Sequence, residues 1–506
     1  MSVWKRTLAA FLSVVLLAGL LPISVFAQET EDDKENVGYI VINETVKIRT
    51  DTGAVEEGSL PTGVSYSGGT LTLNNASLKS LNAFGGDGFT IQLEGSNAIA
   101  LDDNTADTDA ALKLDDCGDV VIQGGGSLTI TSPVEGIAFE RGDRSGTLKI
   151  TGGAKVAAKS TGGYWLDEEN KEYGHSGVSG HMDLTVTDGA SLTAEGGFMG
   201  LLLMGNAAIT DGGTVTANRV HLHGDDDGTP TTTTVGAGGS LNVTVRAEDE
   251  VDGTLGVLAD ASLVLDGGDI RIDTTAKNLD YLNGLDVQSG GNVSLEDGAL
   301  YITLRSGNGI MVQAGSAFHQ SGGSVTVLQS GGEAVDPDHY SSVGLRLEQG
   351  GDAGFSSGTF TTGNTLDCGF SLNDTLTING GDFRLMGRNA PIFVEQRGGL
   401  TVVGGQMDVR NTSTSQDYQH IALRSRGGAL QFLGGTTELY GTDYALVTEG
   451  DVTTLGSGMH AVDNETGREV SLETGAAGIY YYPCTRVTIS SEAGGSSYAA
   501  AMELAN

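Results

Sequence analysis

The amino-acid sequence predicts an all-β fold, a right-handed single-stranded parallel β-helix solenoid of about twelve three-strand coils. Two observations support this prediction. The composition, with 79 glycines, 7 prolines and 6% aromatic residues, offers few large side chains for a globular core but suits tight turns and narrow stacked layers. Pairs of glycines followed by alternating apolar residues also recur about every 25 to 30 residues, at Gly125, Gly212, Gly238, Gly267, Gly322 and Gly380.

Each period contains three short alternating segments. The best-kept unit comprises residues 309–312, 317–320 and 322–327. Strict alternation places Ile310 and Val312 inward and the residues between them outward. Three strands joined by tight corners make one coil, and like strands of adjacent coils pair in parallel. The handedness of parallel crossovers predicts right-handed winding, and the spacing of parallel strands predicts a rod of about 60 Å.

The glycine pair is explained as a corner that needs a positive φ and leaves no room for a Cβ against the adjacent coil. Gly→Val at Gly268 or Gly323 is therefore expected to damage folding more than most outward substitutions.

The domain organisation follows from the ends of the repeat region. Residues 1–27 resemble a secretory signal, with Lys5 and Arg6, an apolar run and a small-residue cleavage site that ends at Ala27. Residues 28–36 form a polar linker, 37–67 an N-terminal cap, 68–450 the β-helix, and 451–506 a C-terminal cap and tail. We therefore expect a protein that is secreted or associated with the cell surface, with no membrane segment after removal of the signal.

Charge and cysteine usage limit the partners and the covalent chemistry. The formal net charge of −38, about −40 after loss of Lys5 and Arg6, repels nucleic acid and anionic lipid and disfavours anionic polysaccharide. Cys117 and Cys368 are predicted about eight coils apart, too far to form a disulfide. We expect a monomer with no cofactor, and the alternative is bound calcium.

Insertions fall mainly at one corner, after the glycine-pair strand and before the next coil. These loops are expected to line a common flank, where a rigid scaffold presents binding residues. The longest insertion predicts a glycan contact, because aromatic faces stack on sugar rings and carboxylates accept hydroxyl hydrogen bonds. Its candidate residues are Tyr164, Trp165, Asp167, Glu168 and Tyr173. The alternative is a loop that folds over its own coil.

A second candidate surface is the outward row on one strand of successive coils. A polar ladder could grip a long polymer, although outward strand positions are commonly polar without a ligand. The row is Gln288, Gln313, Glu348, Asn373, Glu395 and Arg424.

Other motifs give weaker hypotheses. A lyase or hydrolase on this scaffold needs clustered carboxylates or a basic residue beside calcium ligands, and the sequence reveals no such group, so no catalytic or metal residue is assigned. Asp225–Asp227 is interpreted as a solvated acidic turn rather than a calcium site. His221 and His223 point the same way and are interpreted as solvated histidines rather than metal ligands. Arg141–Asp143 spells an integrin-type tripeptide that arises readily by chance.

The opening segments resemble a known family. Residues 39–46, 64–66, 69–76 and 89–99 are similar to the first module of exported β-helix proteins of Gram-positive gut bacteria. Those proteins carry carbohydrate-binding-domain or adhesin-like labels within the broader pectin-lyase-like fold. The resemblance implies the fold and export, and it carries over no catalytic residues.

The expected function is therefore non-enzymatic binding of glycan or of a host or bacterial surface. The alternatives are a polysaccharide lyase or glycoside hydrolase on the same fold, and a structural spacer.

Overall fold

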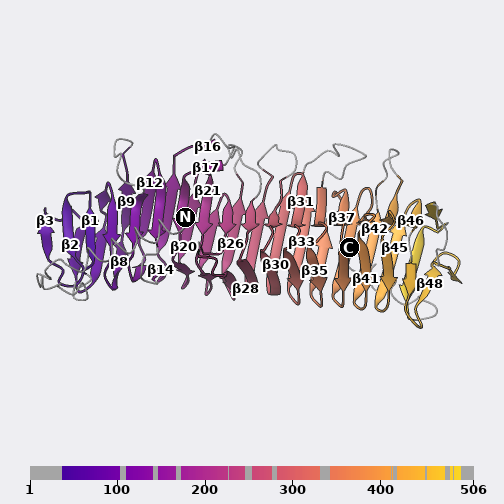
Figure 1. Cartoon of the computed structure of the whole chain (residues 1–506). Coiled ribbons are helices and arrows are strands. Elements are labelled where there is room, and N and C mark those ends of the chain that lie inside the picture. The colour runs from indigo at the N-terminus through magenta and orange to yellow at the C-terminus, as the bar shows by residue number, and fades with distance from the viewer. Residues whose placement is uncertain are drawn as a thin grey trace, which may run out of the picture. The chain divides into compact units, whose positions relative to one another are not determined.

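The computed structural model describes residues 37–102, 110–140, 146–166, 172–225, 227–245, 254–275, 282–330, 342–411, 413, 419–450, 453–472, 479–482 and 484–491. The chain divides into two compact units, Met1–Val37 and Gly38–Asn506, and the fold below is that of the second unit. Its described residues form strands without helices (Figure 1). Accordingly, no described helix has the length and apolar character needed to cross a membrane.

One long sheet, here called sheet A, takes one strand from each repeat. Neighbours pair in parallel from β7 to β46, and antiparallel strands stand at both ends. In pairing order the strands are β3 (Val55–Glu57), β2 (Val46–Arg49), β1 (Tyr39–Ile42), β7 (Leu81–Phe84), β10 (Ala110–Asp115), β13 (Glu135–Glu140), β18 (Ser176–Gly180), β21 (Met199–Leu203), β24 (Val220–Leu222), β27 (Leu255–Val257), β29 (Leu285–Val287), β31 (Gly307–Val312), β34 (Ser342–Leu347), β37 (Cys368–Leu372), β40 (Ile392–Val394), β43 (Ile421–Ser425), β46 (Tyr444–Glu449) and β50 (Ile479–Tyr481).

The second sheet consists of two ladders that share β28 and β30. Ladder B1 contains β4 (Val64–Ser67), β5 (Thr70–Asn74), β8 (Gly88–Glu94), β11 (Asp119–Gln123), β14 (Thr147–Ile150), β19 (Asp183–Val186), β22 (Ala207–Ile209), β25 (Thr231–Gly236), β28 (Ala261–Asp273), β30 (Asn292–Leu304), β32 (Ala317–Gln320), β35 (Asp352–Phe355), β38 (Thr375–Ile378), β41 (Gly399–Val402), β44 (Ala429–Phe432) and β47 (Thr453–Leu455). Ladder B2 contains β6 (Ser77–Leu78), β9 (Ser96–Ala100), β12 (Ser127–Ser132), β15 (Lys155–Ser160), β20 (Ser191–Glu195), β23 (Thr214–Ala217), β26 (Ser240–Thr244), the second halves of β28 and β30, β33 (Ser324–Gln329), β36 (Thr359–Thr362), β39 (Asp382–Gly387), β42 (Gln406–Asn411), β45 (Thr436–Gly441), β51 (Arg486–Ser490), β48 (His460–Asp463) and β49 (Arg468–Glu469).

The chain visits the three ladders in a fixed order, sheet A, then B1, then B2, before it returns to sheet A. Strands β31, β32 and β33 form one such repeat, and each pairs in parallel with its counterpart β34, β35 or β36. The predicted three-segment repeat is therefore confirmed. Long, mostly parallel sheets of this kind are consistent with an all-β solenoid.

The core lies where the three ladders meet. Residues predicted to face inward, such as Ile310 and Val312 of β31, are fully buried. Phe355 of β35 lies among four other phenylalanines from all three ladders. Its ring centroid is 5.1 Å from Phe383, 5.5 Å from Phe360, 6.0 Å from Phe370 and 6.1 Å from Phe318. The alternation of apolar residues thus forms a continuous interior.

The six glycine pairs used for the fold prediction lie at the corner between B1 and B2. At Gly238–Gly239 the first glycine has a φ of +72°, and a Cβ on the second would lie 1.9 Å from the Ile209 carbonyl oxygen of the preceding repeat. At Gly404–Gly405 the order is reversed, because Gly405 has the positive φ and Gly404 faces a neighbouring carbonyl. The corner explanation is confirmed for these pairs: Gly238 and Gly239 divide its two requirements between them, whereas Gly405 meets both, because its Cβ would also lie 2.5 Å from the Gly381 carbonyl oxygen.

Other glycine pairs lie at a different corner, between sheet A and B1. Gly290–Gly291 follows β29, Gly350–Gly351 follows β34 and Gly427–Gly428 follows β43. Glycine pairs therefore mark two corners of the repeat.

The ends of the stack and the cysteines complete the fold. At the start, β1, β2 and β3 pair antiparallel with one another and β1 pairs antiparallel with β7. At the other end, β50 pairs antiparallel with β46 and β51 with β45. Antiparallel ends interrupt the parallel register that would otherwise continue into a neighbouring molecule. Cys117, Cys368 and Cys484 are buried and free.

Candidate functional site

The outer face of sheet A carries two parallel rows of side chains between β29 and β43. The outer row follows the strand register and contains Asp286, Met311, Arg346, Ser371, Phe393 and Arg424. The flanking row lies two residues after the outer row, directly after the last residue of each strand. Its backbone N–H groups donate to the preceding strand in one repeated pattern, and it contains Gln288, Gln313, Glu348, Asn373, Glu395 and Arg426. We call these two rows together the strip.

Five of the six residues in the predicted polar row lie in the flanking row, and Arg424 does not. Arg424 pairs with Phe393, which places it in the outer row, and Arg426 occupies the position next to Glu395. The cause of the error is Ser425, a polar residue that is fully buried on the inner face of β43. Alternation of apolar residues therefore misplaced this strand by two positions. The role of the row in binding stays a prediction.

Side chains of the strip are linked to one another by hydrogen bonds. The buried Asp286 carboxylate accepts from the Gln313 amide at 2.8 Å and from the Gln288 amide at 3.2 Å. Farther along, the Glu348 carboxylate accepts from Arg346 at 2.7 Å and from Asn373 at 3.4 Å. These bonds hold amide and guanidinium groups in fixed positions, and their remaining donors can still reach a ligand.

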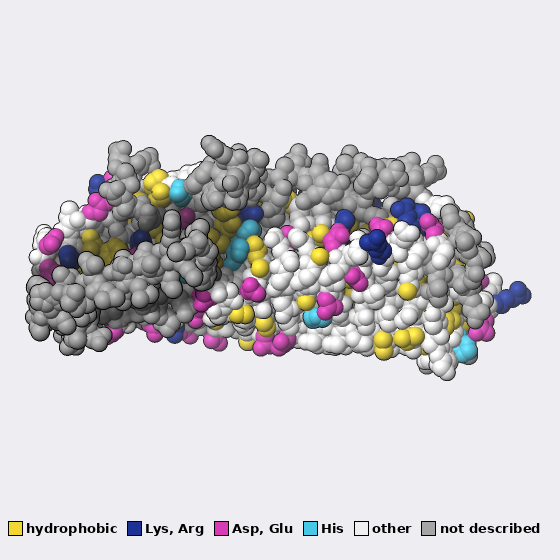
Figure 2. Space-filling model, in the orientation of Figure 1, with side chains coloured by type: hydrophobic (Ala, Val, Ile, Leu, Met, Phe, Trp, Pro, Cys, Tyr) yellow, Lys and Arg dark blue, Asp and Glu magenta, His cyan; other side chains and the backbone are white. Residues whose placement is uncertain are grey.

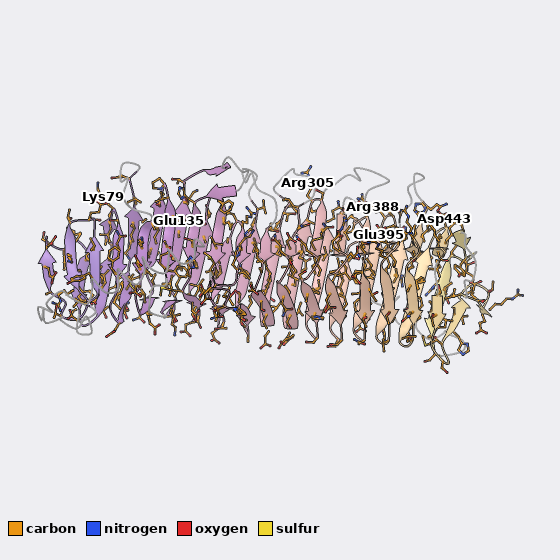
Figure 3. All side chains as sticks on the ribbon, viewed as in Figure 1. Lys79, Glu135, Arg305, Arg388, Glu395 and Asp443 are labelled. Atoms are coloured by element: carbon orange, nitrogen blue, oxygen red, sulfur yellow. The ribbon has the colours of Figure 1, made fainter. Side chains whose placement is uncertain are left out.

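The second half of the strip is rich in arginine, in contrast to the acidic chain as a whole. Arg424 donates to Glu449 at 2.8 Å, and the Arg426 guanidinium lies 5.1 Å from the centroid of the Phe393 ring. Burial raises the pKa of Glu395 (Figure 3), while Arg426 and Arg346 oppose that rise. Basic side chains gather on this part of the visible face (Figure 2). Arginine and glutamate side chains therefore lie on the same or on neighbouring repeats in this half of the strip.

The strands that flank the insertions confirm the predicted corner. Segments such as 103–109, 246–253 and 331–341 each follow a B2 strand and precede a sheet A strand. Hydrogen bonds between polar side chains link the residues of this corner. The buried Asp367 carboxylate accepts from Arg388 at 2.9 Å, and Ser342 donates to Gln329 at 3.1 Å. The insertion corner lies at the start of the sheet A strands, whereas the flanking row of the strip follows their last residues.

The predicted aromatic loop contains a two-stranded hairpin, β16 (Tyr164–Leu166) with β17 (Glu172–Gly174). Trp165 pairs with Tyr173 in its backbone register. The positions of these aromatic side chains, and the whole of Asp167 and Glu168, lie outside the described residues. The glycan contact predicted for this loop therefore stays a prediction.

A group of titratable side chains lies at the base of this hairpin, and sequence reasoning did not find it. The Glu135 carboxylate (Figure 3) accepts from the Ser176 backbone N–H at 2.7 Å and lies 3.6 Å from His175 Nδ1. Burial raises the pKa of Glu135 from 4.5 to about 7, although the hydrogen bonds from Ser176 and Ser179 oppose the rise. Burial also lowers the pKa of His175. Burial therefore favours the neutral form of both groups.

This shift predicts that folding stability falls as the pH rises. A carboxyl whose folded pKa is raised stabilises the fold fully below its unfolded pKa, and that stability is lost as the pH rises through the folded value. Between about pH 4.5 and 7, Glu135 is expected to cost up to about 3 kcal/mol of unfolding free energy.

Denaturant unfolding of Glu135→Gln at pH 5 and pH 8 measures this loss. The variant is expected to gain stability relative to the parent at pH 8 and little at pH 5, because glutamine does not ionise and can still accept from Ser176. A stability difference that does not change with pH contradicts the prediction.

The two histidines predicted to be solvated, His221 and His223, both have intermediate exposure. The rings of His221 and His223 are 6.0 Å apart. Burial lowers the pKa of His221 to about 3, and Arg219 and His223 add to the shift, so this imidazole is neutral under ordinary conditions. Nearby, His181 lies 3.8 Å from Glu140 and 4.0 Å from Asp225. The described part of the chain holds no group of three or more His, Cys, Asp or Glu side chains suited to a metal ion.

The remaining motifs divide between the described and undescribed chain. Arg141–Asp143 and Asp226 lie outside the described residues. Asp225 retains little exposed surface, whereas Asp227 is exposed, so the predicted solvated turn holds only for the latter.

An aromatic pocket at the start of sheet A was also missed. Tyr39 pairs directly with Phe84, and the Lys47 ammonium lies 4.0 Å from the centre of the Tyr39 ring. With Val41 and Glu57 these residues line a cavity of about 510 Å³. Tyr39 and its partner Phe84 are far apart in the sequence, so no local pattern joins them. The pocket and the strip occupy the same outer face of sheet A.

Comparison of this chain with models of known families, with curated proteins and with solved structures found no match. The geometry of the described residues is therefore the basis for the proposals that follow.

Proposed function

We propose that this protein is an exported, non-enzymatic glycan-binding protein, secreted or held at the cell surface, which grips an extended saccharide along the outer face of sheet A. The proposal takes the fold as a right-handed single-stranded parallel β-helix of about twelve coils, like the adhesin-like proteins of Gram-positive gut bacteria that its opening residues resemble. Its ligand is a carbohydrate or a glycan-bearing host or bacterial surface.

The observation that carries the proposal is the flanking row of the strip. Amide and carboxylate groups recur at one repeated position, directly after successive sheet A strands, from Gln288 to Glu395. Parallel strands repeat about every 4.8 Å, so the row offers hydrogen-bond donors and acceptors at regular short intervals along one direction. A saccharide chain presents hydroxyl groups at comparably close intervals. The aromatic pair Tyr39 and Phe84 on the same face provides a surface on which a sugar ring can stack.

A second function has one observation in its favour. Glu135 titrates near neutrality beside His175, and Glu140 lies on the same strand. Glycoside hydrolases use a pair of carboxyls, one of which acts as the acid and has a raised pKa. Reducing-end and 235-nm unsaturated-product assays test hydrolase and lyase activity. Turnover that is lost in Glu135→Gln supports the enzyme and contradicts the non-enzymatic proposal.

Truncation of the flanking row is expected to weaken binding. In Gln313→Ala combined with Asn373→Ala, affinity for the saccharide bound best on a glycan array should fall about tenfold or more, because each lost hydrogen bond contributes about 0.5–1.5 kcal/mol. The matched control is Gln431→Ala on β44, an outward residue of ladder B1 that is part-buried.

Titration calorimetry of parent, double variant and control gives the affinities. Loss of binding in the double variant alone supports the proposal. An equal loss in the Gln431 control, or none in either, removes the strip as the site. A protein that binds no glycan and turns over no polysaccharide favours the structural spacer.

A further inference from the structure

We infer that the second half of the strip recognises a single anionic substituent, a carboxylate or a sulfate, on an otherwise neutral saccharide, with Arg426 as the anchoring residue. This inference rests on the proposed glycan-binding function and specifies its ligand.

Arg426 differs from its neighbours in its partners. Arg346 is paired with Glu348 and Arg424 with Glu449, at 2.7 and 2.8 Å. Within the described chain no carboxylate lies within 4.0 Å of the Arg426 guanidinium. Its recorded side-chain contact is with the ring of Phe393, whose side chain is 1% exposed. The side chain of Arg426 is itself exposed.

Contact with a buried ring restrains the guanidinium and leaves its N–H edge available. Arginine can contact an aromatic ring with one face while its donors bind a carboxylate or sulfate in a bidentate manner. A restrained fork loses less side-chain entropy on binding than a free one. The Arg426 guanidinium can therefore bind a planar carboxylate or a tetrahedral sulfate.

Arg397 adds a second basic group at the same corner. It lies in the turn after β40, directly before Gly398, and the Ala429 N–H of the next repeat donates to the Gly398 carbonyl. Its guanidinium donates to the Gln349 side-chain oxygen at 2.7 Å, and no carboxylate of the described residues pairs with it. Two arginines without carboxylate partners thus occupy turns of adjacent repeats.

The surrounding carboxylates limit how much negative charge the ligand can carry. Glu348, Glu395 and Glu449 lie among the arginines of this region. A polymer with an anion on every sugar would place some of them against these groups, and the whole chain carries a formal charge of −38. Salt screens charges over about 8 Å at physiological ionic strength. A single anion is therefore attracted mainly by the nearby arginines, whereas a polymer with many anions is repelled by the carboxylates along the chain. The inference thus qualifies the expectation from total charge that anionic glycans are disfavoured.

The test compares four probes by titration calorimetry with the full chain: lactose, sialyllactose, sulfated lactose and polygalacturonate. Sialyllactose and sulfated lactose carry one carboxylate and one sulfate and so distinguish the two anions. At least one of them is expected to bind about tenfold more tightly than lactose and more tightly than polygalacturonate, with affinity that falls as salt increases.

Variants locate the anion. Arg426→Gln should abolish the preference for the anionic probe over lactose, and Arg426→Lys should restore part of that preference, since lysine keeps the charge but not the fork. The matched control Arg384→Gln removes an exposed arginine on β39 of ladder B2 and should have no effect. Thermal unfolding confirms that each variant is folded.

The outcomes separate this inference from the proposed function. Equal affinity for lactose and both anionic probes, or tighter binding of polygalacturonate, overturns the single-anion inference and leaves glycan binding intact. A preference that survives in Arg426→Gln overturns the assignment of Arg426. Absence of binding to these probes and to every array glycan overturns both.

Discussion

Gly323→Val is expected to lower the unfolding free energy by about 3 kcal/mol or more, or to prevent folding. Gly323 has a φ of +59°, a region that valine rarely adopts. A Cβ there would lie 2.5 Å from the Gly298 carbonyl oxygen and 2.6 Å from Leu295 Cδ2. Backbone strain from the positive φ and steric overlap of the Cβ therefore add at one residue. The overlapping oxygen belongs to the backbone of the neighbouring repeat and cannot move away as a flexible side chain would.

Gly125→Val is the matched control for this prediction. Gly125 belongs to another glycine pair at the same type of corner, yet no atom lies within 4 Å of its ideal Cβ and its φ is not positive. Urea unfolding of both variants measures the difference. Similar stability of the two variants would mean that close stacking of repeats does not explain the glycines at these corners.

Phe355→Ala is expected to cost about 3–5 kcal/mol of unfolding free energy. Phe355 is 1% exposed and lies within 6.1 Å of four phenylalanine rings. Truncation removes apolar contacts with all three ladders at once and leaves a cavity that short strands, fixed by their ladder bonds, cannot collapse to fill.

Tyr301→Ala on the outward face of β30 is the control, because Tyr301 is 40% exposed and should cost little. Chemical unfolding of both variants, followed by circular dichroism, gives the two costs. A loss below 1 kcal/mol for Phe355→Ala contradicts a core shared by the three ladders.

The repeat and its parallel pairing could be predicted because they depend on local alternation. Ile310 and Val312 face inward by the same period of two that separates them in sequence. The approach failed where a buried position is polar, as at Ser425, because nothing in the local pattern shows that this residue faces the core. The predicted alignment of β43 with its neighbour is therefore wrong by two residues. Arg426, and not Arg424, occupies the flanking row.

The candidate sites were harder to predict because they join residues that are distant in sequence. Tyr39 and Phe84 meet only through the pairing of β1 with β7, and Glu135 meets His175 only through the stacking of β13 on β18. The shifted pKa values of Glu135 and His221 arise chiefly from burial, which packing around these residues determines. The outward row from Gln288 to Glu395 was accessible because each member follows an apolar pattern that repeats in every coil.

Hydroxyl-radical footprinting with and without the best-bound saccharide tests most directly whether the outer face of sheet A is the binding surface. Met311 in the outer row is readily oxidised and has intermediate exposure, whereas Tyr301 reports on ladder B2. Saturation with saccharide is predicted to slow modification of Met311 and to leave Tyr301 unchanged. Protection of Tyr301 with continued modification of Met311 would contradict the assignment of the binding surface to sheet A.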